Sequence, residues 1–163
     1  MSTLSHQLNT RAVFPTLTSQ SPYQTQQQLF THLTHLQTED LDRLLLSSRA
    51  KGSTPSITSR QLAQNVATLL GLHLKEILPV LGLSESTLTR QPVPGQQLLD
   101  QTYSITRIFA LVANVLTPEG AQHWLTTPNP ALEGQQPFAL LSTRYGEEKV
   151  ENLIGALLAG AVL

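Results

Sequence analysis

Residues 104–119 read SITRIFALVANVLTPE, and this stretch decides the fold class. Its large apolar residues recur at spacings of three and four, which places them on one face of a helix. Thr117, Pro118 and Glu119 then supply an N-cap, a first helical residue and a first-turn acid for another helix. The apolar face consists of Ile105, Ile108, Phe109, Val112, Val115 and Leu116. No stretch of the chain shows sustained two-residue alternation, so the sequence predicts an all-α fold, a small helical bundle.

Two further helices are expected after residue 126. Pro137 opens a short one, and a final helix should run from residue 147 to about residue 159. Gly160 can end that helix and leave residues 161–163 as an apolar tail. The apolar positions that the final helix should bury are Val150, Leu153, Ile154, Leu157 and Leu158.

Upstream, residues 57–95 predict a helix-turn-helix module, because two short helices are joined by a Gly-Leu-Ser turn. Ser84 is the expected N-cap of the second helix, and Pro79 should kink the first helix or end it early. The residues able to contact phosphates or base edges are Ser84, Ser86, Thr87, Thr89 and Arg90. Since only one of them is cationic, the sequence leaves DNA binding and its absence equally open.

Residues 1–56 form an N-terminal extension in this interpretation. Up to residue 22 the spaced apolar positions are few, so that segment is expected to be flexible. From about residue 24 to residue 48 the leucines follow helical intervals, which predicts a helical hairpin or one broken helix. The predicted organisation is therefore residues 1–56, residues 57–95 and a C-terminal domain of residues 96–163.

Composition narrows the function classes. The 163 residues carry 10 Lys and Arg against 11 Asp and Glu, and there is no cysteine. A near-neutral chain does not bind nucleic acid or anionic lipid by bulk charge, and thiolate metal sites and disulfides are excluded. The longest apolar run, residues 153–163, is too short to span a membrane, and no signal peptide is recognisable, so a soluble cytoplasmic protein is expected.

No catalytic motif is present. The sequence contains no nucleophile elbow, phosphate-binding loop or dinucleotide fingerprint. His32 and His35 lie one turn apart, but two polar positions on an exposed helix face explain them better than a metal site. Glu147 and Glu148 are explained by favourable charge at a helix N-terminus. We therefore expect neither an enzyme, nor a cofactor, nor a bound metal.

A specific pattern of residues occupies the last third of the chain. It consists of Trp124-Leu125, Pro128-Asn129-Pro130-Ala131-Leu132, Gly134, Pro137, Leu140-Leu141, Gly146, Val150 and Leu153. This order of residues resembles the C-terminal toxin-binding domain of Xre/MbcA/ParS-type antitoxins. The predicted helix-turn-helix region also lies where that family places its Xre-like DNA-binding module.

The resemblance implies an antitoxin of a type II toxin–antitoxin system, a non-catalytic inhibitor. Its implied partner is a RES-domain toxin that consumes NAD or transfers ADP-ribose from it, and the C-terminal domain is implied to cover the toxin's active-site cleft. A further implied role, autorepression of its operon, depends on DNA binding. The expected toxin-binding residues are Trp124, Asn129, Pro130, Leu132, Gly134, Leu157, Leu158, Val162 and Leu163.

Alternatives remain open at this point. Pro128 and Pro130 fix the backbone on either side of Asn129, whose side chain can hold the turn by hydrogen bonding to nearby backbone. The segment from Trp124 to Gly134 therefore also makes sense as a structural corner alone. Val162 and Leu163 either enter the toxin's cleft or complete the protein's own core. A homodimer is expected from the wide apolar face of residues 104–116, with weak operator binding. The competing function is a stand-alone transcriptional regulator whose C-terminal domain dimerises.

Overall fold

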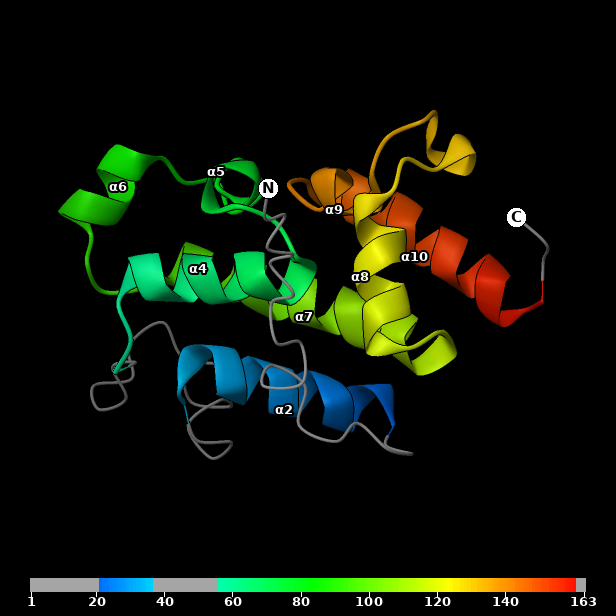
Figure 1. Ribbon diagram of the computed structural model, residues 1–163, viewed down its shortest axis with the longest axis horizontal. Helices are drawn as coiled ribbons and strands as arrows, with labels where there is room; N and C mark the ends of the chain where they lie inside the picture. The colour runs from blue at the N-terminus through cyan, green and yellow to red at the C-terminus, as the bar shows by residue number, and fades with distance from the viewer. Residues whose placement is uncertain (1–20, 37–55, 161–163) are drawn as a thin grey trace, which may run out of the picture.

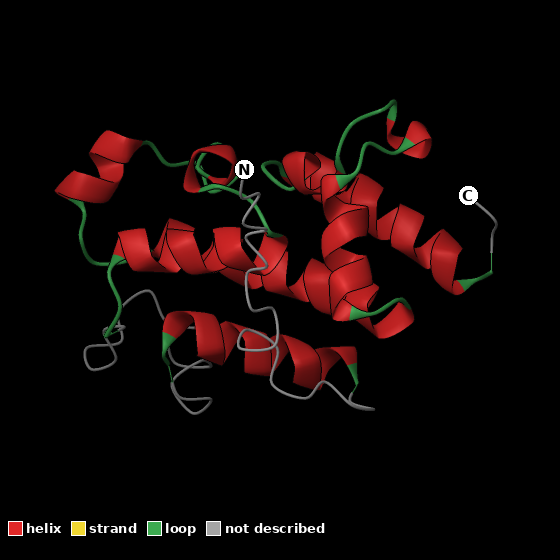
Figure 2. Ribbon diagram, in the orientation of Figure 1, coloured by secondary structure: helices red, strands yellow, loops and turns green. Residues whose placement is uncertain are grey.

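The computed structural model of the chain describes residues 21–36 and 56–160. Figures 1 and 2 show that these residues are built from helices joined by short loops, with no strand among them. The predicted all-α bundle is therefore confirmed. The helices are α2 (Pro22–Thr34), α4 (Ser59–Leu70), α5 (Leu74–Ile77), α6 (Glu85–Arg90), α7 (Gln96–Val115), α8 (Pro118–Thr126), the 3-10 helix η1 (Pro130–Leu132), α9 (Pro137–Leu140) and α10 (Arg144–Leu158).

Helix α7 is the long central element of the bundle. It begins at Gln96, eight residues before the predicted start, and its 20 residues span about 30 Å. It packs most extensively against α2 and α8 and also contacts α10. Ile105, Ile108 and Phe109 are completely buried, which confirms the predicted apolar face. Leu116 does not belong to that face, because it follows the last helical turn and is 43% exposed.

Helix α2 lies alongside α7 and α4 (Figure 1). Its N-terminus is closed by a capping box in which Ser21 and Gln24 bond each other's backbone N–H groups. The Phe30 ring is fully buried and meets the Tyr103 ring of α7 edge to face, with the ring centroids 5.6 Å apart. The Asn65 side-chain amide of α4 donates to the Leu33 carbonyl at 3.0 Å. Part of the N-terminal extension therefore belongs to the core.

The predicted helical segment of residues 24–48 is described only as far as residue 36. Helix α2 begins at Pro22, which was expected to be the last flexible residue, and residues 1–20 lie outside the described residues. It stops at Thr34, because His35 adopts the left-handed conformation with φ of 56°. Residues 37–48 lie outside the described residues.

Helices α5 and α6 follow the predicted local signals, and α4 begins and ends at local signals of its own. Thr58 and Gln61 form a capping box at the start of α4, and Gly71 ends that helix with φ of 67°. Helix α5 ends at Ile77, two residues before Pro79. This end is expected because a proline cannot continue a helix. The Ser84 hydroxyl accepts a hydrogen bond from the Thr87 amide, which confirms Ser84 as the N-cap of α6.

The C-terminal helices confirm the predicted caps and correct two details. The Thr117 hydroxyl accepts from the Gly120 amide at 2.9 Å at the start of α8. Helix α10 begins at Arg144, three residues before the predicted start. Val150, Leu153 and Ile154 are buried as expected, but Leu157 is only half-buried and Leu158 is 62% exposed. The prediction that Leu158 is buried was wrong because the last turn of α10 extends past the helices it packs on (Figure 1).

The buried apolar residues form a single cluster that runs from α2 to α10. The apolar face of α7, from which a homodimer was expected, is therefore covered within the chain by α2, α8 and α10. Among the described residues, no helix combines the length and hydropathy needed to cross a bilayer.

If α2 is part of the core, the substitution Phe30→Ala should lower the free energy of unfolding by about 3–5 kcal/mol, since it removes a fully buried ring. The control is His32→Ala, an exposed position on the same helix, which should change stability by less than about 0.5 kcal/mol. Urea unfolding followed by circular dichroism measures both. Equal stability of the two variants would contradict the packing described here.

Candidate functional site

The connection between α8 and α9 is a tight corner built around Asn129. The Asn129 Oδ1 atom accepts from the Ala131 amide at 2.9 Å, and its backbone carbonyl accepts from the Leu132 and Gly134 amides at 3.0 Å each. The Asn129 amide in turn donates to the Gln135 carbonyl at 3.0 Å. An asparagine suits this place because its short side chain can bond the backbone two residues on. The predicted turn-holding role of Asn129 is confirmed.

Two other residues give this corner its shape. Gly134 has φ of 77°, in the left-handed region that favours glycine. Leu132 is 6% exposed and belongs to the core cluster, and the half-buried Trp124 packs against that cluster. Pro130 and Gly134 are exposed. The corner is thus anchored by its apolar side chains, and beside Pro130 and Gly134 it presents the Glu133 side chain, which is 80% exposed, to solvent.

Gly146 brings α10 close to the end of α9. A Cβ atom at this position would overlap the backbone carbonyl oxygen of Leu140 and approach its Cβ atom at 3.0 Å. Because the obstructing atom is backbone, a side chain could be accommodated only by moving the two helices apart. Glycine at residue 146 is therefore required by close approach, which accounts for its place in the sequence pattern.

An ion-pair cluster joins α7 to the first turns of α10. The Arg107 guanidinium of α7 donates to Glu147 Oε1 at 2.6 Å and also pairs with Glu151. Glu147, which is 8% exposed, further accepts from the Ser104 hydroxyl and pairs with Arg144 at 3.3 Å. Every polar atom of this buried carboxylate is thus matched by a donor, as burial of a charge requires.

The pKa values of this cluster follow from its geometry. Burial raises the pKa of the Glu147 carboxyl, but the hydrogen bonds from Ser104 and Arg107 and the positive charges of Arg107 and Arg144 outweigh it, so the pKa lies below the ordinary glutamate value. Burial lowers the pKa of Arg107. Its hydrogen bonds to Glu151 and Glu147, and their negative charges, raise the pKa by more than burial lowers it, so the net shift is upward. Both groups are therefore held in their charged forms.

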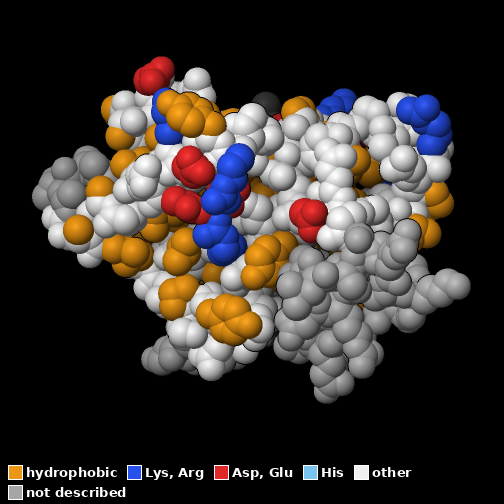
Figure 3. Space-filling model, turned by 180° about the vertical axis from the view of Figure 1, so that it is seen from behind, with side chains coloured by type: hydrophobic (Ala, Val, Ile, Leu, Met, Phe, Trp, Pro, Cys, Tyr) orange, Lys and Arg blue, Asp and Glu red, His pale blue; other side chains and the backbone are white. Residues whose placement is uncertain are grey.

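The cluster borders an open hollow of about 480 Å³ between α7, the α9–α10 connection and α10. Figure 3 shows paired basic and acidic side chains in the middle of this back face, with hydrophobic side chains exposed beside them. The lining includes Asp100, Gln101, Tyr103 and Ser142 in addition to the ion-paired residues. The hollow is polar. The ion pairs of Arg107 with Glu147 and Glu151 join its α7 and α10 walls, so the arrangement serves to hold α10 in place, while Asp100 accepts a hydrogen bond from the Gln96 side-chain amide.

The structure separates the predicted toxin-binding residues into two groups. Trp124, Asn129, Pro130, Leu132 and Gly134 lie in α8 and the corner that follows it, and η1 contacts α10. The second group, Leu157 and Leu158, lies at the far end of α10, about 13 Å along the helix from Lys149, whose ammonium group pairs with Glu133 of the corner. Val162 and Leu163 lie outside the described residues.

The predicted DNA-contacting residues lie together on α6, at the opposite end of the molecule (Figure 1). The Ser84 hydroxyl is within 2.9 Å of the Ser86 and Thr87 hydroxyls, so these groups already bond one another. Thr89 and Arg90 are exposed. Glu85, in the first turn of α6, pairs with Arg60 of α4 at 2.8 Å, which places a carboxylate on this helix and engages a nearby cation.

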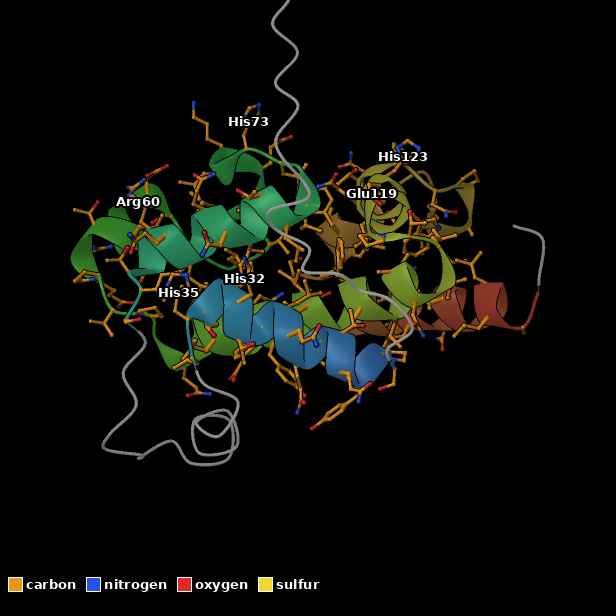
Figure 4. All side chains as sticks on the ribbon, turned by 60° about the horizontal axis from the view of Figure 1, so that its bottom comes forward. His32, His35, Arg60, His73, Glu119 and His123 are labelled. Atoms are coloured by element: carbon orange, nitrogen blue, oxygen red, sulfur yellow. The ribbon has the colours of Figure 1, made fainter. Side chains whose placement is uncertain are left out.

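The histidines that the structure describes show no metal-binding arrangement. Figure 4 places His32 and His35 at the end of α2, His73 just before α5 and His123 on α8. Within residues 21–36 and 56–160, no three His, Cys, Asp or Glu side chains are grouped so that they could hold a metal ion.

Sequence reasoning missed the ion-pair cluster. Glu147 does lie in the first turn of α10, as predicted, but its principal partners are Ser104 and Arg107 on α7. One signal in the sequence could have indicated this cluster. Arg107 lies between Ile105 and Ile108, and a charged residue next to a buried face needs an oppositely charged partner.

Comparison with known proteins identifies part of the chain. Residues 110–160 match the family model described as the antitoxin Xre/MbcA/ParS C-terminal toxin-binding domain. The resemblance predicted from the sequence pattern is confirmed over these residues, which include the corner, Gly146 and α10. A search of curated proteins finds no match.

The close approach at Gly146 generates a matched pair of variants. Gly146→Ala should lower the free energy of unfolding by about 1–3 kcal/mol through overpacking. Gly155→Ala, on the same helix but with open space around it, should leave stability unchanged or raise it by up to about 1 kcal/mol. Thermal unfolding compares the two. Equal effects would mean that α9 and α10 do not meet at Gly146.

The lowered pKa of Glu147 predicts a pH dependence. Its stabilising effect is complete above the ordinary glutamate pKa of about 4.3 and is lost as the pH falls through the lower pKa of the folded state. At pH 7, Glu147→Gln should therefore be less stable than the wild type by about 1–3 kcal/mol. This difference should shrink as the pH falls toward about 3.

The matched control is Glu148→Gln, because that side chain is 55% exposed and its one ion pair within residues 21–36 and 56–160 is with Arg144. It should change stability by less than about 1 kcal/mol at any pH. Urea unfolding at several pH values measures all three proteins. If Glu147→Gln remains less stable than the wild type at acid pH, the shape of the glutamate side chain, and not its charge, accounts for its role.

Proposed function

We propose that this protein is a non-catalytic antitoxin that binds a RES-domain toxin and neutralises it by covering the toxin's active-site cleft. The observation that carries the proposal is the match of residues 110–160 to a toxin-binding domain of antitoxins. The structure supports it because the pattern residues have physical roles in one rigid unit. Asn129 and Gly134 shape the corner, and Gly146 allows the approach of α10 to α9.

The reaction that such an inhibitor would stop is the consumption of NAD, or the transfer of ADP-ribose from it, by the RES-domain partner. The antitoxin contributes no reacting group in this proposal. It acts as a rigid body whose helices exclude NAD from the cleft. In this proposal, the corner and α10 form the inhibiting part, while Val162 and Leu163 are its expected continuation.

The region of residues 57–95 is proposed to act as an Xre-like module that allows weak operator binding and autorepression by a dimer. The exposed Thr89 and Arg90 of α6 support this role. The shortness of α6 and the pairing of Arg60 with Glu85 favour low affinity, because few cations remain to meet phosphates. The alternative, a stand-alone transcriptional regulator, makes operator binding the main activity.

Co-expression tests the proposal directly. The full chain and the RES-domain protein that the proposal expects beside its gene are expressed from separate heterologous promoters, so operator binding cannot contribute. The full chain is used because α2 covers α7, and a fragment of residues 96–163 would expose that apolar face. Co-expression should restore growth and the cellular NAD level.

The variant Arg90→Ala serves as the control, because its side chain lies on the proposed DNA-binding helix. It should protect as well as the wild type. Cells that grow no better with the full chain than with the RES-domain protein alone would contradict the antitoxin proposal and favour the regulator.

A further inference from the structure

We infer that the toxin-binding surface includes the apolar end of the molecule. This apolar end is formed by Tyr23, Leu116, Leu157 and Leu158. The surface therefore extends beyond the matched family domain to helix α2. The inference rests on the proposed function and deepens it. Tyr23, Leu116 and Leu158 are three of the large apolar residues that remain exposed among the described residues, at 60%, 43% and 62% respectively.

The apolar end combines parts that are distant in the sequence. Figures 1 and 4 both place the N-terminal end of α2, the C-terminal end of α7 and the C-terminal end of α10 at the same end of the molecule. Tyr23 lies in the first turn of α2, Leu116 directly follows α7, and Leu158 is the last residue of α10. Three helix ends thus bring uncovered apolar side chains to one region.

The same three segments lack charge. No Asp, Glu, Lys or Arg occurs in residues 21–36, 108–118 or 152–160. Along the chain, the latter two runs are bounded by Arg107, Glu119 and Glu151. Depletion of charged residues at the centre, with a polar rim, is the compositional mark of protein–protein interfaces. Tyrosine is also enriched among the residues that dominate binding energy, since it buries a large area while keeping its hydroxyl hydrated.

The occupant of this surface is the toxin, because two of its three parts lie inside the matched domain. Residues 110–160, described as toxin-binding, contain Leu116, Leu157 and Leu158. Because the start of α2 lies at the same end of the molecule (Figures 1 and 4), a partner that contacts these leucines has it within the span of an ordinary interface. Tyr23 then adds contacts from a helix that the family domain does not contain.

Binding of the purified RES-domain protein to the full chain, measured by biolayer interferometry, tests the inference with single substitutions of exposed residues. Leu116→Ser and Leu158→Ser should each weaken binding at least about tenfold, and Tyr23→Ser should do so as well. The control is Val93→Ser, since Val93 is 54% exposed in the α6–α7 connection at the opposite end of the molecule. It should bind within about twofold of the wild type. Circular dichroism should show unchanged melting temperatures for all four variants.

The outcomes separate the claims. Wild-type affinity of Leu158→Ser and Leu116→Ser would overturn the apolar end as the toxin's surface, while the proposed function would stand. Weak binding of those two with normal binding of Tyr23→Ser would overturn the part played by α2. Absence of wild-type binding would contradict the proposed function itself. A dimer that forms without toxin and dissociates in Leu158→Ser would assign the surface to a second copy of the chain instead.

Discussion

The packing of α2 against α7 is the contact on which the rest of the structure depends. Helix α7 carries more apolar surface than α8 and α10 cover, and the remaining face would be exposed to water without α2. The buried Phe30 ring on Tyr103 and the hydrogen bond from Asn65 to the Leu33 carbonyl fix the position of α2. Helix α6 precedes the N-terminal end of α7 and α8 follows its C-terminal end, so the covered α7 separates α6 from α8 along the molecule (Figure 1).

Helix α10 is held differently from α2, and this difference bears on function. Its first half is attached through the buried Glu147, which Arg107 and Ser104 contact, and through the close approach at Gly146. Its last turn packs on little, and Leu158 stays exposed. A helix that is rigid at its base and uncovered at its tip suits recognition of a partner, because little conformational entropy is lost on binding.

Much of this fold was predictable from sequence because its signals are local. The caps at Thr58, Ser84 and Thr117, the stop at Gly71 and the shortening of α5 before Pro79 each involve residues within one or two helical turns. Among the proposed site residues, the role of Asn129 in its turn was predicted for the same reason.

The features that sequence reasoning missed are contacts between distant residues. The cover of α7 by α2, the pairing of Arg107 with Glu147, and the exposure of Leu158 depend on how helices are arranged, which periodicity within one helix does not specify. Native-state hydrogen exchange most directly tests the central claim that α2 and α7 form one cooperative unit. The buried amides of both helices should exchange with the same free energy, that of global unfolding. Exchange of α2 amides at a much lower free energy, with α7 still protected, would contradict the claim.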